Sequence, residues 1–387
     1  MKSLLNTRVL SPLKWTFFGA LALALVACGS NDDPPAPAST TTVLSAALSG
    51  DQELPPTLTG ALGTGTLALV SPSRDISGNI VLDGLTATAA HIHLGDTGVN
   101  GAVIVPLTQT VPGTWSVPAG TTLTESQAAA FVSGGLYYNA HTAANPGGEI
   151  RGQIGREVFA AQMSSAHEVP ANASSATGNG LLSFDPTTKA FKATVTLTGL
   201  AAAAAHIHTG TTGTNGAILF GLTQTTPTSG IWVSAADAVL TDAQLATLKA
   251  GGLYFNAHSA AFPGGEIRGQ IARNVRFANL SAAEEVPTNA SAATGSGSLI
   301  VDPATRAASG SIALTGMTAT AAHIHLGAVG SNGPVIVPLS NTAGNVWAVP
   351  ANTVLSADQF KAYKQGNLYY NAHSVAFPAG EIRGQIR

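Results

Sequence analysis

Cysteine and charged residues are both scarce in this chain of 387 residues. The only cysteine is Cys28, so no disulfide can form within the chain. Charged residues make up 10% of the sequence and the formal net charge is -3, which provides no basic surface for nucleic acid. The sequence has no P-loop, no Gly-x-Ser-x-Gly nucleophile turn and no Ser-His-Asp order. We therefore expect no nucleic-acid partner, and the common hydrolase classes are disfavoured.

Long hydrophobic runs are also missing, apart from one near the N-terminus. Three basic residues precede an apolar run over residues 15–26, which is the pattern of a secretory signal peptide. The run is shorter than the ~20 apolar residues that a membrane-spanning helix needs. It leads through Leu-Val-Ala into Cys28, which resembles the bacterial lipobox. In that motif the cysteine sulfur is acylated and the chain is cut just before it.

The N-terminal region therefore predicts an exported lipoprotein. Residues 1–28 are the expected signal peptide and lipobox, and acylated Cys28 is the expected attachment to membrane lipid. Residues 29–41 are rich in Ser, Asp, Pro, Ala and Thr without apolar periodicity, as expected for a flexible linker. Gly29 stands where, by resemblance to known sorting signals, an aspartate would favour the inner membrane. We expect a lipid-anchored protein of the cell envelope, at the outer membrane.

Beyond the linker, one segment occurs three times. The motif His-Ile-His begins at residues 91, 206 and 323, at intervals of 115 and 117. An Asn-Ala-His motif follows in each copy, and Glu-Ile-Arg-Gly-Gln-Ile closes it. A copy of this size can bury a core of its own, unlike the short repeats of a solenoid. The sequence therefore predicts three domains, over residues 42–156, 157–273 and 274–387.

Most of each copy is predicted as strand and turn, because short apolar alternations are bounded by Gly, Pro, Asn and Asp. The Ala-rich stretch before each His-Ile-His, such as residues 201–205, is also predicted as strand, since threonines alternate there in the sister copies. One short helix per copy is predicted from a capping box, with a glycine ending it. The capping pairs are Thr124 with Gln127, Thr241 with Gln244 and Ser356 with Gln359, and the glycines are Gly134, Gly251 and Gly366. The predicted fold class is all-β, with three tandem antiparallel β-sandwiches that each carry one crossover helix.

Three motifs together resemble the CHRD domain, first described in the developmental protein chordin and also found in bacterial exported proteins. In the first copy they are the His-Ile-His that begins at His91, Tyr-x-Asn-x-His over residues 137–141, and Gly-Glu-Ile-Arg-Gly-Gln over residues 148–153. The resemblance covers nearly all of the chain after residue 42, and the second copy departs from it slightly at Phe255. It implies an immunoglobulin-like or superoxide-dismutase-like β-fold, but no settled activity.

Nine of the ten histidines belong to the repeated pattern. Residues i and i+2 of a strand face the same side, so the two imidazoles of each His-Ile-His project together. A third histidine from a distant strand would complete a three-nitrogen set for zinc or copper, with one position left open. The predicted metal ligands are His91, His93 and His141, then His206, His208 and His258, then His323, His325 and His373. A hydrogen-bonded structural cluster without metal is the alternative interpretation.

The closing motif adds a glutamate and an arginine to each copy. The carboxylate is a candidate for the fourth metal position or for orienting an imidazole. The two side chains share a face of the strand, however, which favours a structural ion pair. The pairs are Glu149 with Arg151, Glu266 with Arg268, and Glu381 with Arg383.

Two functions follow from these patterns. The preferred one is a non-catalytic binding or scaffolding protein with an envelope or extracellular ligand, in which three copies supply reach or avidity. The other is a metal-dependent redox enzyme resembling copper/zinc superoxide dismutase, favoured by a His-x-His on a sandwich strand. The lack of a disulfide and of further histidines in each copy opposes the enzyme.

Overall fold

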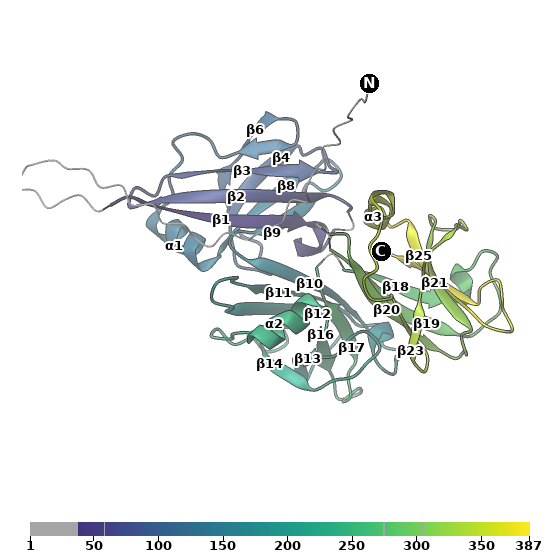
Figure 1. The fold of residues 1–387 in the computed structure, drawn as a ribbon. Coiled ribbons are helices and arrows are strands. Elements are labelled where there is room, and N and C mark those ends of the chain that lie inside the picture. Colours follow the sequence, from purple (N-terminus) through teal and green to yellow (C-terminus); the bar gives the residue numbers. More distant parts are fainter. Residues whose placement is uncertain (1–37, 58, 274, 303–304) are drawn as a thin grey trace, which may run out of the picture.

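The computed structural model describes residues 38–387 except residues 58, 274, 303 and 304. The predicted signal peptide, Cys28 and most of the predicted linker lie outside the described residues. The described chain forms three bodies of antiparallel strands that follow one another along the sequence (Figure 1). Within the described ranges, no helix combines the length and the apolar character needed to cross a membrane.

The first domain is a nine-stranded sheet in the order β5-β4-β8-β9-β1-β2-β3-β7-β6. It begins at Thr40, inside the range predicted as linker. Its elements are β1 (Thr40–Ser49), η1 (Gly50–Gln52), β2 (Leu62–Ser71), β3 (Ile76–Asp83), β4 (Ala89–Leu94), β5 (Ala102–Pro106), β6 (Thr108–Val111), β7 (Thr114–Ser116), α1 (Glu125–Ser133), β8 (Leu136–His141) and β9 (Ile150–Gln153).

The second domain closes into a barrel in the order β10-β11-β12-β15-β14-β13-β16-β17. Its elements are β10 (Glu157–Ser164), η2 (Ser165–His167), β11 (Thr177–Phe184), β12 (Phe191–Thr198), β13 (Ala204–Thr209), β14 (Ile218–Gln224), β15 (Ile231–Val233), α2 (Asp242–Lys249), β16 (Leu253–His258) and β17 (Ile267–Ile271).

The third domain repeats the order of the first, as β22-β21-β25-β26-β18-β19-β20-β24-β23. Its elements are β18 (Val275–Ser281), η3 (Ala282–Glu284), β19 (Thr294–Val301), β20 (Ala308–Thr315), β21 (Ala321–Leu326), β22 (Val335–Pro338), β23 (Ser340–Ala343), β24 (Val346–Ala348), α3 (Ala357–Lys364), β25 (Leu368–His373) and β26 (Ile382–Ile386). The predicted all-β fold with one short helix per copy is confirmed.

One position distinguishes the strand that closes the barrel from its counterparts in the two open sheets. In the second domain β14 runs unbroken through Gly221 and pairs with both β13 and β15. Pro106 and Pro338 occupy this position in the sister domains, where β5 and β22 end. Proline lacks the N–H that a ladder hydrogen bond requires. The three domains are therefore variants of one architecture.

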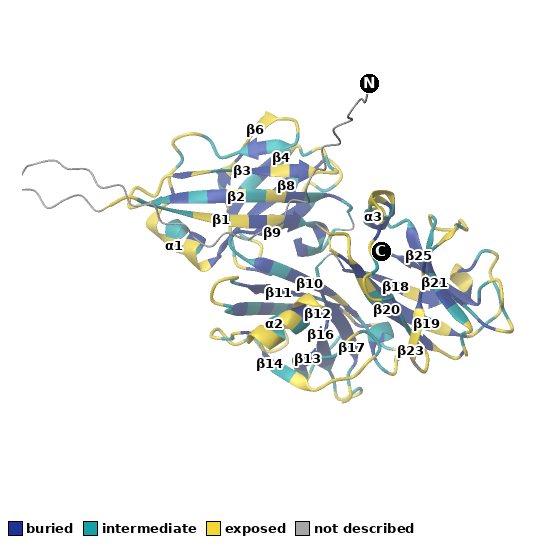
Figure 2. Cartoon of the chain, viewed as in Figure 1, coloured by how far each residue is buried: buried dark blue, intermediate teal, exposed yellow. Residues whose placement is uncertain are grey.

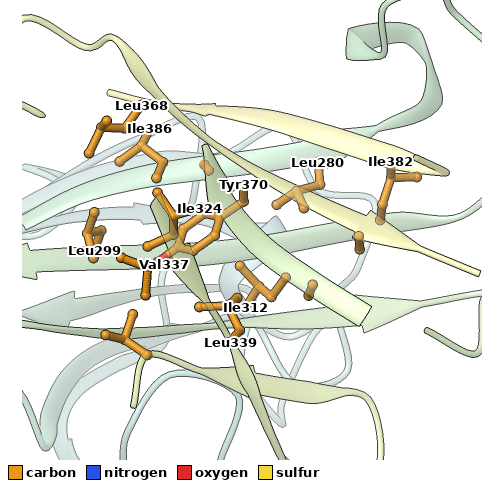
Figure 3. Close-up of a cluster of buried hydrophobic side chains, with 14 of the residues drawn as sticks. Leu280, Leu299, Ile312, Ile324, Val337, Leu339, Leu368, Tyr370, Ile382 and Ile386 are labelled. Carbon is orange, nitrogen blue, oxygen red and sulfur yellow. The ribbon is translucent and has the colours of Figure 1, made fainter. Parts of the chain in front are cut away.

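The strands that carry the histidines alternate between an apolar and a polar side. Ile92 of β4 and Tyr138 of β8 are fully buried in the first core, as the burial map of Figure 2 also indicates for these strands. Figure 3 shows the third core, where Ile324 and Tyr370 from the matching strands meet beside Leu299. Burying an isoleucine or leucine side chain stabilises the fold by roughly 1.5–3 kcal/mol. This core therefore fixes the register that places the histidines on the opposite side.

The predicted helix boundaries are confirmed. In α1 the Thr124 hydroxyl accepts from the Gln127 N–H at 3.2 Å, and the Gln127 side chain accepts from the Thr124 N–H at 2.9 Å. Both halves of the capping box are also present in α2 and α3. Gly134 caps α1 with a φ of 73°, in the left-handed region that favours glycine.

The prediction for the Ala-rich stretch is only partly right. Residues 201–203 are neither helix nor strand, and β13 begins at Ala204. Ala204 is the first residue of this strand that pairs with β16, opposite His258. The strand therefore starts where a partner becomes available, although the local composition suggested an earlier start.

Candidate metal centre

Two neighbouring strands bring the three histidines of each domain together. In the first domain His93 pairs with Tyr137 across β4 and β8, and Ala89 pairs with His141. His141 is thus the diagonal neighbour of His91 on the same face. The His91 and His141 ring centroids are 4.9 Å apart, and those of His91 and His93 are 5.6 Å apart.

All nine predicted metal ligands lie in such clusters, one to a domain. In each, one nitrogen from every ring can be chosen so that the three lie within 4.8 Å of one another. The clusters are His91, His93 and His141; His206, His208 and His258; and His323, His325 and His373.

Backbone carbonyl groups fix the protonation of two rings in each cluster. Nδ1–H of His93 donates to the Gly101 carbonyl at 2.9 Å, and Nδ1–H of His141 donates to the Pro146 carbonyl at 3.0 Å. A carbonyl oxygen can only accept, so the proton is on Nδ1 and the lone pair of the neutral ring is on Nε2. Metal-binding histidines are commonly oriented by such a contact on the other ring nitrogen. The same contacts recur in the other domains as His208 to Gly216, His258 to Pro263, His325 to Gly333 and His373 to Pro378.

One of these lone pairs is buried without a partner in every domain. Among the described residues, Nε2 of His93, His208 and His325 has no hydrogen-bond partner. In the first domain the remaining two rings face each other, with His91 Nδ1 and His141 Nε2 3.1 Å apart. The third domain repeats this contact at 3.2 Å. In the second domain the matching atoms, Nδ1 of His206 and Nε2 of His258, are also buried and unpartnered.

The electrostatics of the clusters favour neutral imidazoles. Burial lowers the pKa of all nine histidines below the ordinary value of 6.5. For His91 the pKa is lowered further by the charges that His141 and His93 would carry. Because the neutral ring is the form that binds a metal ion, these lone pairs are available at neutral pH.

A tyrosine and a buried arginine hold the second histidine in place. The Tyr137 ring stacks on His93 with a centroid distance of 4.8 Å and an interplanar angle of 14°. The Arg151 guanidinium carbon lies 3.5 Å from the centroid of the same tyrosine ring. Arg151 is only 1% exposed and donates to the Asp96 carbonyl at 2.9 Å. Tyr254 with Arg268, and Tyr369 with Arg383, repeat the arrangement.

The predicted ion pair between Glu149 and Arg151 is wrong. The Glu149 carboxylate accepts hydrogen bonds from Thr59 at 2.8 Å and from Thr142 at 2.5 Å. The carboxylate whose charge acts on Arg151 belongs instead to Glu53. Glu266 and Glu381 likewise accept from Ser174 and Ser291, and no ion pair joins them to Arg268 or Arg383 in the part of the chain that the structure describes. The described clusters contain histidines alone, so none of these glutamates is placed as a fourth ligand.

Several residues of the site carry no chemical signature in the sequence. Gly101 accepts from His93 through its carbonyl, and its N–H donates to the Tyr137 hydroxyl at 3.0 Å. A β-carbon at Gly101 would overlap the carbonyl oxygen of Leu94, so only glycine fits there. The spacing Tyr-x-Asn-x-His was the available signal for Tyr137, because alternate residues of β8 face the same side.

The donor set fits zinc or copper. Zinc–nitrogen distances of ~2.0–2.1 Å in a tetrahedral site place ligand nitrogens roughly 3.4 Å apart. His91 and His141 already present nitrogens 3.1 Å apart, and because the three nitrogens lie within 4.8 Å of one another, any nitrogen pair exceeds this tetrahedral spacing by at most about 1.4 Å. His93 is buried, whereas His91 and His141 are partly exposed. Three imidazoles would therefore hold an ion whose fourth position faces solvent.

Comparison with known proteins gives one kind of match. The family model of the CHRD domain matches residues 44–154, 159–271 and 276–386. Each matched segment contains one histidine cluster. No curated protein and no solved structure matches the chain.

Proposed function

Because the chain belongs to the CHRD domain family and repeats the same histidine cluster in all three domains, we propose that it is a metal-binding protein that holds one zinc or copper ion in each domain. Its role is binding or scaffolding at the cell envelope, with lipid attached at Cys28. The open fourth position would accept a donor atom from a ligand.

The observation that carries the proposal is the unpartnered Nε2 of His93, His208 and His325. A purely hydrogen-bonded cluster explains the contact between His91 and His141, but it leaves this buried lone pair unused. An unsatisfied buried polar atom costs about 1–3 kcal/mol. A metal ion would use this lone pair together with the other two. The metal interpretation therefore accounts for all three rings, and the structural interpretation accounts for two.

The chain's own residues would determine the binding geometry. The Gly101 and Pro146 carbonyls keep the protons of His93 and His141 on Nδ1, and Tyr137 sets the plane of the His93 ring. A bound zinc or copper ion would supply a Lewis-acidic position open to a further ligand. A dinuclear copper–zinc centre needs more ligands than three imidazoles, and each cluster found among the described residues has three histidines. The binding role is therefore favoured over the redox enzyme.

Metal analysis tests the proposal directly. The chain from residue 29 onward, produced without a histidine tag, is stripped of metal, reconstituted with zinc or copper and separated from free ion. We expect about three equivalents per chain, from the three clusters. Changing His206, His208 and His258 to asparagine should lower this to about two, and the untouched domains serve as internal controls. Less than a tenth of an equivalent in the unaltered protein would end the metal proposal.

The lipid anchor has an independent test. Cys28→Ala removes the only cysteine and with it the acylation site. The variant should move from the membrane fraction to the soluble fraction of the cell envelope, while its metal stoichiometry stays unchanged. A variant that remained with the membrane would contradict attachment through Cys28.

A further inference from the structure

Consecutive domains of the chain are joined by a contact that occurs twice, whereas the first and third domains meet through different residues, Arg276 with Thr59 and Lys364 with Asp83. The loop after β4 of the first domain packs on strands β11 and β12 of the second. The Thr97 hydroxyl donates to Ser183 Oγ at 2.8 Å, and the Thr97 carbonyl accepts from the Thr194 hydroxyl at 3.5 Å. Thr97 is 5% exposed as a result.

The loop after β13 of the second domain packs on the third domain in the same way. The hydroxyls of Thr212 and Ser298 lie 2.8 Å apart, and the Thr212 carbonyl accepts from the Ser311 hydroxyl at 3.2 Å. Thr97 and Thr212 each lie six residues after the first histidine of their cluster. Thr194 and Ser311 each lie twelve residues before it. The loop threonine and the β12 or β20 hydroxyl are therefore equivalent in the two contacts, whereas Ser183 and Ser298 lie two residues apart on the matching strands β11 and β19.

This series leaves one loop unused and leaves the middle of one sheet face uncovered, although Asp83 at the end of that face pairs with Lys364 of the third domain at 3.3 Å. The position of Thr97 and Thr212 in the third domain is Val329, which is 54% exposed. A β-carbon added at the neighbouring Gly330 would have no other heavy atom within 4 Å. The position of Thr194 and Ser311 in the first domain is Asn79 on β3. Near it on the same strand, Val81 is 51% exposed.

The unused loop and the unused face are chemically compatible. In the second contact Gly213 approaches Ala313, which occupies the position of Val81. The equivalent approach by the third domain's loop would cover Val81 and remove exposed apolar surface from water. The first contact adds an ion pair between Lys192 and Asp96 at 2.9 Å. The two free surfaces carry Ser77 and Ala328 at these positions, so they meet without like-charge repulsion.

We propose that the loop at Val329 docks on the β2–β3 face of the first domain of a second copy of this chain, so that copies associate head to tail. Such a contact joins two different surfaces, and it extends into a row of copies unless its geometry closes a ring. One loop buries a small area, so association is weak in dilute solution and strengthens where chains are concentrated. The proposal is independent of metal binding.

Disulfide trapping tests this contact at two exposed positions. Cys28→Ser gives a cysteine-free background, to which Val81→Cys and Val329→Cys are added together. We expect mild oxidation with diamide to produce dimers and larger species in denaturing, non-reducing gels. The matched control combines Val329→Cys with Val132→Cys, because Val132 is 68% exposed and belongs to α1 instead of β2 or β3.

The expected result is a cross-linking yield at least fivefold higher for the Val81 pair than for the Val132 pair. Equal yields in the two pairs, or only monomers in the first, would overturn the proposal. Val329→Glu should also lower the average mass measured by sedimentation at high protein concentration. An unchanged sedimentation profile of a self-associating protein would place its contact elsewhere and overturn the proposal as well.

Discussion

We expect the stability of the protein to depend on pH, because a buried carboxyl group lies beside each histidine cluster. Glu53 is 4% exposed, and burial raises its pKa from 4.5 to about 7 against the lowering effect of the Arg151 charge. Glu53 Oε1 and the side-chain oxygen of Asn139 have no hydrogen-bond partner among the described residues. A proton on Glu53 would provide the missing donor. Glu168 is the equivalent group in the second domain, where burial likewise raises its pKa from 4.5 to about 7.

The sign of the effect follows from the direction of these shifts. The folded-state pKa of Glu168 lies above its unfolded value, so the stability contributed by the neutral carboxyl is present in full below pH 4.5 and is lost as pH rises through about 7. A shift from 4.5 to about 7, at ~1.4 kcal/mol for each unit, amounts to about 3 kcal/mol for the domain above pH 8. For a domain of this size that is a change in melting temperature of about 10 °C.

Glu168→Gln tests this reasoning, because glutamine stays neutral and offers an N–H where the acid offers an O–H. Calorimetry of the full chain should show the second domain melting alike in variant and wild type at pH 4.5. At pH 8 the variant should melt about 10 °C higher. Glu284→Gln is the matched control, because Glu284 is an exposed glutamate. This variant should leave the melting temperature unchanged at both pH values. A Glu168→Gln protein that is no more stable than wild type at pH 8 would refute the argument.

Two further substitutions probe the residues that support the cluster of the second domain. Gly265→Ala should destabilise this domain by roughly 2 kcal/mol or more and so lower its melting temperature. Gly265 has a φ of +136°, and a β-carbon there would lie 2.8 Å from Glu168. An unchanged melting temperature in calorimetry would contradict this prediction. Arg268→Lys should cost about 3 kcal/mol in denaturant unfolding, because lysine cannot reproduce the planar stack on Tyr254. An unchanged unfolding midpoint would show that the stack does not hold this site.

The fold could be predicted wherever the evidence in the sequence is local. Capping boxes and their terminal glycines involve residues close together in the chain, and all three helices begin where these pairs place them. Apolar alternation is likewise local, and it assigned Ile92 to the core and its two histidine neighbours to the other face. The start of β13 depends on the distant strand β16, which explains why residues 201–203 were assigned wrongly.

The side chains of the candidate site could also be predicted from local patterns in the sequence, but the backbone groups that orient them could not. Repetition in the sequence identifies the nine histidines, and the geometry of a strand is enough to place two of each three on the same face. The carbonyl groups of Gly101 and Pro146 have no signature in the sequence, since every residue carries a carbonyl. The partners of Glu149 were missed because Thr59 lies 90 residues away and reaches the carboxylate only in the folded domain.

The polar face behind the histidines is better explained by orientation than by stability. Burying a charged arginine and a carboxyl group is expensive, and apolar replacements of such groups are often as stable or more so. Arg151 nevertheless lies fully buried against Tyr137, which in turn stacks on His93. This series of contacts fixes the one ring in the cluster whose buried lone pair lacks a partner. A stable apolar layer in place of these contacts would leave the His93 ring free to turn. Arg268 supports His208 in the second domain as Arg151 supports His93 in the first. An Arg268→Lys protein that folds but loses metal affinity in this domain would therefore identify the layer as part of the binding site.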